Sequence, residues 1–205
     1  MRIKAFKDCL EENGLDHFVL TDANSIYYLT GFLDVPVASN FLLVPLKDEP
    51  SLLVSSLSRQ AAMDSARGCA VDVVRRGEKA EEKASKKLSS SNPRSVGFDT
   101  MTVPAYLKIS GELKAAKVSP KPELIWRLRR VKDDQELEYM RRAAQFGDRG
   151  MEAATEAVKP GVEEFRVAAE AEYAMRKMGS EGVAFDTIVA SGKRSAYPHG
   201  GCTAK

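Results

Sequence analysis

The order of strand-forming and helix-forming segments changes once along this chain, and that change constrains the fold more than any other feature. Up to about residue 120, short runs of β-branched and large apolar residues alternate with amphipathic helical segments. Beyond Pro120 and Pro122, which interrupt regular structure, the pattern consists almost wholly of long helices. Alternating strands and helices are typical of a sheet covered by helices. We therefore predict an α/β domain over 1–120 and a second domain over 121–205.

The expected sheet of the first domain is mixed rather than purely parallel. The spacer Lys47-Asp48-Glu49-Pro50 separates two β-prone runs and is typical of a hairpin turn. The stretch 117–122 is expected to be a break between the domains. Strands are expected at 17–21, 40–45, 51–55, 71–74 and 95–98, and helices at 3–12, 57–66, 77–91 and 104–116.

The second domain is expected to contain helices at 122–131, 133–158 and 162–178, followed by a lone strand at 185–190. In the middle helix an apolar stripe is formed by Leu137, Met140, Ala144, Met151 and Ala154. A single strand cannot close a sheet, because a stable sheet usually needs three or more strands. The apolar helix faces would therefore stay uncovered, and we expect that the chain holds only part of this domain.

Composition and charge exclude several classes of protein. Hydrophobic residues make up 43% and charged residues 29%, as in ordinary globular proteins rather than disordered or membrane-spanning ones. The formal charge of +2 comes from interspersed basic and acidic residues, so neither a nucleic-acid partner nor a membrane is expected. Cys9, Cys69 and Cys202 have no spacing typical of disulfides or zinc sites, and the start of the chain lacks a secretory signal. We therefore expect a cytoplasmic protein.

Three segments resemble those of one known family. The run Phe-Asp-Thr-Ile-Val-Ala-Ser-Gly at 185–192, followed by Pro198-His199-Gly200, resembles a signature of the pita-bread metallopeptidases, in the branch holding prolidase, aminopeptidase P and creatinase. The run Tyr-Leu-Thr-Gly-Phe at 28–32 resembles a motif of that branch's amino-terminal domain. The run at 128–132 resembles its entry into the catalytic domain. Lys193 and Arg194 depart from the family, in which a proline and a small polar residue are usual.

The resemblance implies a ribonuclease-H-like α/β amino-terminal domain followed by the truncated start of an α+β pita-bread domain. It also implies two divalent metal ions of the Mn or Co type, held by two aspartates, a histidine and two glutamates. All five ligands lie beyond the position that matches His199, so none is expected within 1–205. In such a site a metal-bound water is the nucleophile and the metals polarise the carbonyl. A homodimer is implied as well.

Three residues are candidates for contact with a substrate. His199 matches the family's imidazole near the leaving group, which can donate a hydrogen bond as charge develops. Phe185 and Ile188 match positions that line the pocket for the first substrate side chain, although ordinary core packing explains such residues equally well. His17 has no such support and is expected to be structural. Cys202 lies close to His199 in sequence, but a cysteine hydrolase is the weaker interpretation.

The resemblance leaves three hypotheses for the complete protein. The first is a metal-dependent Xaa-Pro peptidase, a prolidase-like dipeptidase rather than an aminopeptidase P, acting on proline-containing di- or oligopeptides. The second is a non-catalytic pita-bread module that binds a partner. The third is a creatinase-like amidinohydrolase that keeps the histidine and uses no metal. Because the ligand set is missing, we expect residues 1–205 alone to be inactive.

Overall fold

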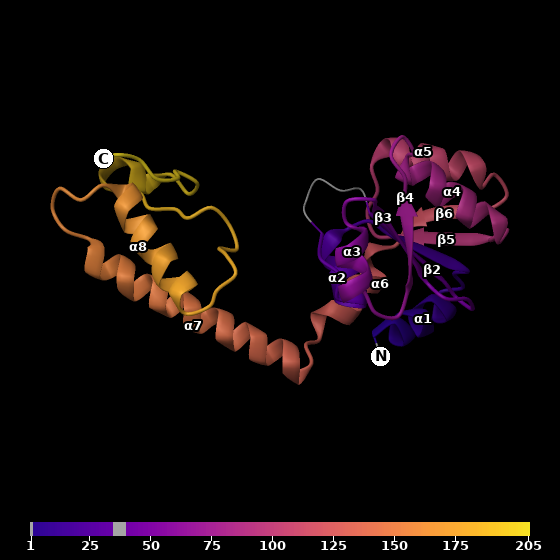
Figure 1. The fold of residues 1–205 in the computed structure, drawn as a ribbon, viewed down its shortest axis with the longest axis horizontal. Helices are drawn as coiled ribbons and strands as arrows, with labels where there is room; N and C mark the ends of the chain where they lie inside the picture. The colour runs from indigo at the N-terminus through magenta and orange to yellow at the C-terminus, as the bar shows by residue number, and fades with distance from the viewer. Residues whose placement is uncertain (1, 35–39) are drawn as a thin grey trace. The chain divides into compact units, whose positions relative to one another are not determined.

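The computed structural model describes residues 2–34 and 40–205, and the chain divides into two compact units. The first unit ends at Val131, and the second runs from Lys132 to Lys205 (Figure 1). Each unit has its own helices, and the β-sheet belongs to the first.

Within the described part of the first unit, six strands form one mixed sheet in the order β4-β3-β2-β1-β5-β6. The strands β1, β2 and β3 are antiparallel neighbours, whereas the pairs β1/β5, β3/β4 and β5/β6 are parallel. The hairpin predicted between β2 and β3 is confirmed, and so is the mixed α/β class. The strands are β1 (His17–Leu20), β2 (Phe41–Pro45), β3 (Ser51–Ser55), β4 (Ala70–Val74), β5 (Ser95–Phe98) and β6 (Lys117–Pro120).

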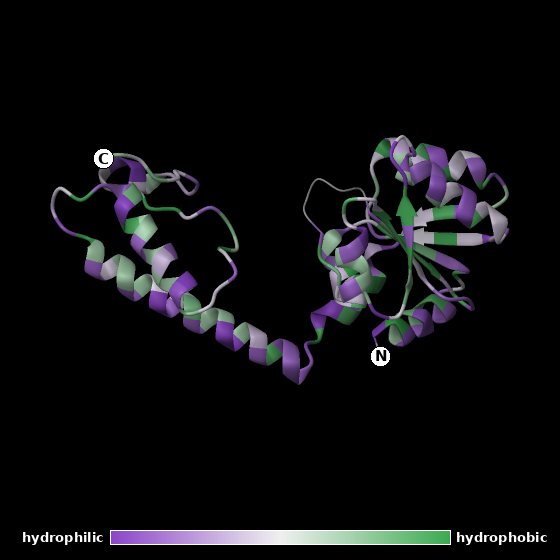
Figure 2. Ribbon diagram, viewed as in Figure 1, coloured by the Kyte–Doolittle hydropathy of each residue, from purple (hydrophilic) through white to green (hydrophobic). Residues whose placement is uncertain are grey.

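Helices cover both faces of this sheet, and the strand sequences show why. Alternate residues of a strand point to opposite faces, and in β1 both sets are apolar: Phe18 packs in one cluster and Val19 in the other. Figure 2 shows hydrophobic residues along the strands and on the helix faces that meet them. One face carries α1 (Arg2–Glu12), α2 (Ala23–Thr30), α3 (Arg59–Ser65) and α6 (Pro122–Arg130), and the other carries α4 (Ala80–Ser90) and α5 (Val103–Glu112).

Helix α2 was not expected from the sequence, although its ends carry clear signals. The Asp22 side chain accepts a hydrogen bond from the Ser25 amide and caps the start of the helix. Gly31 ends it in a left-handed conformation with φ of 78°, which glycine adopts without steric cost. The segment 28–32 singled out in the sequence is therefore the last turn of α2 and its cap.

The segment 117–122 was expected to be a break, and that expectation is wrong for its first part. Residues 117–120 form the edge strand β6, which pairs with β5 in parallel register. Pro120 is tolerated at this position because it is the last residue of an edge strand. Helix α6 follows, and its residues Leu124 and Ile125 are buried in the core of the first unit. This burial explains why the first unit ends at Val131, after the two prolines.

The second unit contains the helices α7 (Asp134–Ala157) and α8 (Glu164–Lys177). Asp133 and Glu136 form a capping box at the start of α7. The two helices pack closely at Gly150, where a Cβ atom would lie 2.9 Å from Met175 Cγ. The apolar stripe of α7 is largely uncovered, since Met140 is 55% and Met151 69% exposed.

In residues 2–34 and 40–205, no helix combines the length and the apolar character needed to cross a membrane.

Candidate active site

The segment that follows α8 carries all three candidate residues, and its conformation differs from the prediction. Residues 185–190 were expected to form a strand, but the structure has them in an irregular segment. The physical reason is that a strand needs a hydrogen-bonding partner, and no strand of the described residues pairs with this segment. The single regular element beyond α8 in the described chain is a short 3-10 helix, η1 (Gly192–Ala196).

One buried carboxylate holds this segment in place. Glu164 is the first residue of α8 and its side chain is only 3% exposed. Its Oε1 accepts hydrogen bonds from the Ser191 amide at 2.6 Å and from the Ser191 hydroxyl at 2.8 Å. Its Oε2 accepts from the Thr203 amide at 3.0 Å and from the Thr203 hydroxyl at 2.7 Å. Both oxygens are therefore occupied, each by one end of the segment 191–203.

The charge of Glu164 is stabilised by these donors. The Thr203 hydroxyl is the largest influence, and together with Ser191 it lowers the pKa of the Glu164 carboxyl to about 2, although burial acts in the opposite direction. Arg194 Nε lies 3.6 Å from Oε2 and adds a positive charge. The lowered pKa favours the charged form of Glu164.

Further hydrogen bonds fasten the same segment. The Phe165 amide, in the first turn of α8, donates to the Thr203 carbonyl at 3.3 Å. Arg194 Nη2 donates to the Gly200 carbonyl, across the turn that contains His199. Cys202 Sγ donates to the Thr187 carbonyl at 3.1 Å, and the Thr187 hydroxyl donates to Glu172 on α8 at 2.5 Å.

The three candidate residues occupy different parts of this segment. His199 lies between the two attachment points, with an exposed side chain that makes no hydrogen bond to any other residue the structure describes. Phe185 is 74% and Ile188 40% exposed, so core packing within the described chain does not account for them. The bond from Cys202 to Thr187 brings the stretch that holds Phe185 and Ile188 beside the stretch that follows His199. Their roles toward a substrate stay predictions.

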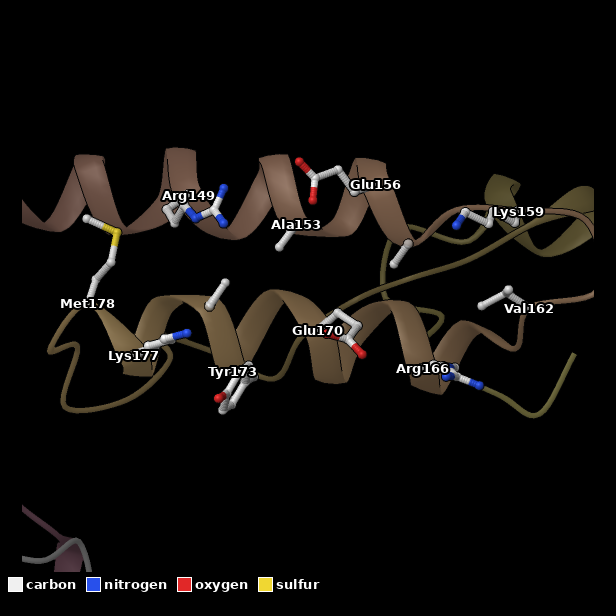
Figure 3. Close-up of a pocket in the computed structure, with 12 residues that line it drawn as sticks. Arg149, Ala153, Glu156, Lys159, Val162, Arg166, Glu170, Tyr173, Lys177 and Met178 are labelled. Atoms are coloured by element: carbon white, nitrogen blue, oxygen red, sulfur yellow. The ribbon is translucent and has the colours of Figure 1, made fainter.

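A groove of the same unit lies between α7 and α8 and has a volume of about 890 Å³. In Figure 3, Met178 extends from the end of α8 toward α7, and Ala153 lies on the side of α7 that faces α8. None of the three candidate residues lines this groove. Its charged lining residues are of both signs: Arg149, Glu156, Lys159, Arg166, Glu170 and Lys177. Four of these residues are basic and two are acidic.

The side chains needed for a metal centre are not gathered in the described chain. Across residues 2–34 and 40–205, no three His, Cys, Asp or Glu side chains come together in a group that could hold a metal ion. Glu164 has both oxygens bound to Ser191 and Thr203, and so it offers no open ligand position. The residues present therefore do not fit a two-metal centre.

The sequence reasoning missed Glu164, Ser191 and Thr203, although one signal was present. Glu164 lies on the apolar stripe of α8, in phase with the buried residues Val167, Ala168 and Ala171. A carboxylate at a buried helix position requires partners, because an unpaired buried charge is very costly. The identity of those partners depends on the path of the segment 179–203. Sequence periodicity carries no information about that path.

Two family descriptions match this chain. The Creatinase/Prolidase N-terminal domain matches residues 2–131, and Metallopeptidase family M24 matches residues 138–205. An Xaa-Pro dipeptidase of Pyrococcus furiosus is 28% identical over 200 residues, which cover 97% of this chain and 55% of the relative. The chain spans about half the length of the curated relatives it matches.

Solved structures agree with this match. An Xaa-Pro dipeptidase from Bacillus anthracis has a TM-score of 0.83 at 29% identity, and the match covers 100% of this chain and 56% of the dipeptidase chain. The prolidase from Pyrococcus horikoshii OT3 has a TM-score of 0.86 at 26% identity, with the same two coverages. The six-stranded mixed sheet agrees with the ribonuclease-H-like amino-terminal domain that the resemblance implied. The chain therefore belongs to the pita-bread metallopeptidase family M24, in the prolidase branch, and carries a creatinase/prolidase amino-terminal domain together with the first part of the catalytic domain.

Proposed function

We propose that this chain is part of a metal-dependent Xaa-Pro dipeptidase, in which His199 assists cleavage of the peptide bond before proline. The observation that carries the proposal is the match of the whole chain to the solved Xaa-Pro dipeptidase and prolidase. It is supported by the exposed position of His199 on a segment whose two ends are fastened to Glu164.

The chemistry of the bond before proline explains the need for such a histidine. That bond is a tertiary amide, so its nitrogen has no N–H by which an enzyme can orient it. The nitrogen must also gain a proton before it can leave. A positioned imidazole that donates a hydrogen bond to the carbonyl or to the departing nitrogen contributes typically ~10²–10⁴-fold to the rate.

Phe185 and Ile188 are proposed to contact the residue before proline. Both are exposed apolar side chains on the segment that carries His199. Substrate pockets are lined mainly by such residues, with a few polar groups that fix orientation. We propose that they provide the apolar wall of the pocket for that first side chain.

The M24 family implies divalent metal ions in the complete proteins. Because the described residues do not fit such a centre, we propose that the metal ligands belong to residues outside this chain. The homodimer implied by the resemblance stays a prediction, which light scattering tests. The cytoplasmic location expected from the cysteine pattern and the start of the chain stays a prediction as well.

An assay of the protein as its gene encodes it tests the proposal. We expect hydrolysis of Met-Pro and Leu-Pro in the presence of Mn²⁺ or Co²⁺, and loss of that hydrolysis after chelation. Met-Ala is the matched control, because its peptide nitrogen carries a hydrogen. Cleavage of Met-Ala in preference to Met-Pro would replace the proposal by a general dipeptidase. No cleavage of either peptide would favour a partner-binding module.

A further inference from the structure

Glu164 contacts the candidate loop in a way that ordinary helix capping does not explain. A carboxylate in the first turn of a helix usually binds the helix's own amides or acts on its dipole. Here the bonds of Glu164 run instead to residues 27 and 39 positions further along the chain. The N-cap residue of α8, Glu163, makes no side-chain capping bond.

The two attachment points enclose His199. Ser191 binds one oxygen of Glu164 and Thr203 binds the other, and His199 lies between them in sequence. The bond from Arg194 to the Gly200 carbonyl further restricts the turn at His199. A loop whose ends share one buried carboxylate has far fewer conformations than a loop with free ends. The position of the imidazole is thus set from α8, although His199 itself has no hydrogen-bonding partner in the described chain.

We propose that Glu164 is a positioning residue for His199: its carboxylate, through Ser191 and Thr203, holds the 191–203 loop in the conformation in which the imidazole meets the substrate. This inference rests on the proposed function, because it requires His199 to act on the peptide. Glu164 touches neither substrate nor reacting atoms and acts through the loop alone.

The substitution Glu164→Gln tests this role with minimal change of shape. It keeps one acceptor oxygen and replaces the other with an amide nitrogen, which cannot accept a bond from a backbone N–H. One backbone amide, that of Ser191 or Thr203, then loses its partner. A displacement of a catalytic group by about 1 Å costs up to ~10²-fold in rate. We expect kcat for Met-Pro to fall by about 10- to 100-fold, with a much smaller change in KM.

A double-mutant cycle with His199→Ala separates positioning from general support of the fold. If Glu164 acts through His199, Glu164→Gln lowers kcat in the parent and has almost no further effect once His199 has been replaced. Equal losses of kcat in both backgrounds would overturn the inference. Glu163→Gln is the matched control, since Glu163 is the exposed neighbour with no capping bond, and its kcat should equal that of the parent.

Amide hydrogen exchange gives a readout that does not depend on activity. Either the Ser191 or the Thr203 amide, whichever loses its acceptor oxygen, should exchange at least about 10-fold faster in Glu164→Gln than in the parent or in Glu163→Gln. Unchanged exchange at both amides would overturn the inference. Should Glu164→Gln fail to fold by circular dichroism, Thr203→Val replaces it. This variant loses the hydroxyl bond to Oε2 and the bond that the hydroxyl accepts from the Lys205 amide, and it keeps the backbone bond of residue 203 to Oε2.

Failure of the inference and failure of the proposed function have different signatures. A parent protein with no activity on Met-Pro overturns the proposed function and the catalytic part of this inference together. A parent that cleaves Met-Pro while the cycle is additive overturns the inference alone. Faster exchange together with a non-additive cycle supports it.

Discussion

The Asp99 carboxylate accepts a hydrogen bond from the Thr21 backbone amide, with Oδ1 3.0 Å from the nitrogen. Asp99 follows β5 and Thr21 follows β1, so this bond joins the ends of two parallel neighbours in the sheet. The amides of Asp22 and Thr100 also donate to Asp99, which is only 7% exposed. Burial outweighs these donors and raises the pKa of Asp99 above its ordinary value.

The substitution Asp99→Asn should reveal this raised pKa as a pH dependence of stability. A raised pKa means that the folded state binds the proton more tightly than the unfolded state, so the contribution of Asp99 is full below 3.8 and is lost as the pH rises through the raised value. The Asn side chain does not titrate and keeps one acceptor oxygen. Stability of the variant relative to the parent should therefore increase from acidic to neutral pH in urea unfolding. A difference that is constant with pH would contradict this.

For Glu164→Gln, the stability of the variant relative to the parent should change with pH in the opposite direction. The pKa of Glu164 is lowered from 4.5 to about 2, chiefly by the Thr203 hydroxyl, so the stability it contributes is present above pH 4.5 and is lost as the pH falls toward 2. The variant should melt below the parent at pH 6, and this gap in Tm should close toward pH 2. Glu163→Gln, measured in parallel, should show no such pH-dependent gap. A gap that stays open at pH 2 would mean that lost packing rather than lost charge is responsible.

Gly97→Ala should destabilise the first unit. A Cβ at Gly97 in β5 would lie 2.7 Å from Phe18 Cδ2 and 2.9 Å from Leu15 Cδ1, and both of these residues are buried. Overpacking of a core costs typically about 1–3 kcal/mol. The control is Gly111→Ala in α5, where no atom lies within 4 Å of the added Cβ. It should leave stability unchanged or raise it by up to about 1 kcal/mol, because alanine favours the helix. Denaturant unfolding measures both variants, and equal stability of the two would contradict the packing argument.

Most of the first unit follows from local pattern. The strand predicted at 95–98 coincides with β5, whose apolar residues Val96 and Phe98 alternate with Ser95 and Gly97 and pack together on one face of the sheet. Helix α2 was missed although Asp22 and Gly31 mark its ends, since its residues include the β-prone Ile26, Tyr27 and Tyr28. Strand β6 was missed because Pro120, its last residue, and Pro122 just beyond it were interpreted as a break, whereas the edge pairing depends on β5.

The candidate site was predictable only in part. His199 was identified through a family resemblance, and the structure places it on a fastened loop. The strand at 185–190 was wrong, because alternation of apolar residues does not reveal whether a partner strand exists. Glu164 was missed because its partners Ser191 and Thr203 are distant in sequence, and hydrogen bonds between such positions leave no periodic signal.

A polypeptide of residues 1–205 should not hydrolyse Met-Pro or Leu-Pro, even with excess Mn²⁺ or Co²⁺. The described residues form no group of side chains that could hold a metal ion. Without a metal-activated water, no nucleophile is available to attack the amide. Equilibrium dialysis should likewise find no stoichiometric Mn²⁺ on the chain. Turnover at an enzymatic rate, or one tightly bound ion per chain, would show that a metal site exists within these residues.

The substitution His199→Ala in the complete protein tests whether His199 has a catalytic role or only a structural one. If the imidazole donates a hydrogen bond that strengthens as charge builds on the peptide, its loss weakens the transition state more than the bound substrate. We expect kcat for Met-Pro to fall by roughly 10²-fold or more, with KM moving much less. Metal content should not change, because His199 is proposed to be no metal ligand. The melting temperature should barely move, because the side chain is exposed.

The matched control is His17→Gln, since His17 is the other of the two histidines in the chain. The Nε2 atom of His17 lies 3.0 Å from the Ser91 hydroxyl in the first unit, and His17 is not part of the segment that carries His199. The His17→Gln variant should therefore keep the parental kcat. A His199→Ala protein with near-parental kcat would make His199 an ordinary loop residue. Loss of metal from that variant would instead make His199 a ligand. If His199 is a hydrogen-bond donor on the 191–203 loop, kcat should fall while the metal is retained. Only this result shows that the imidazole acts on the peptide rather than on the ions.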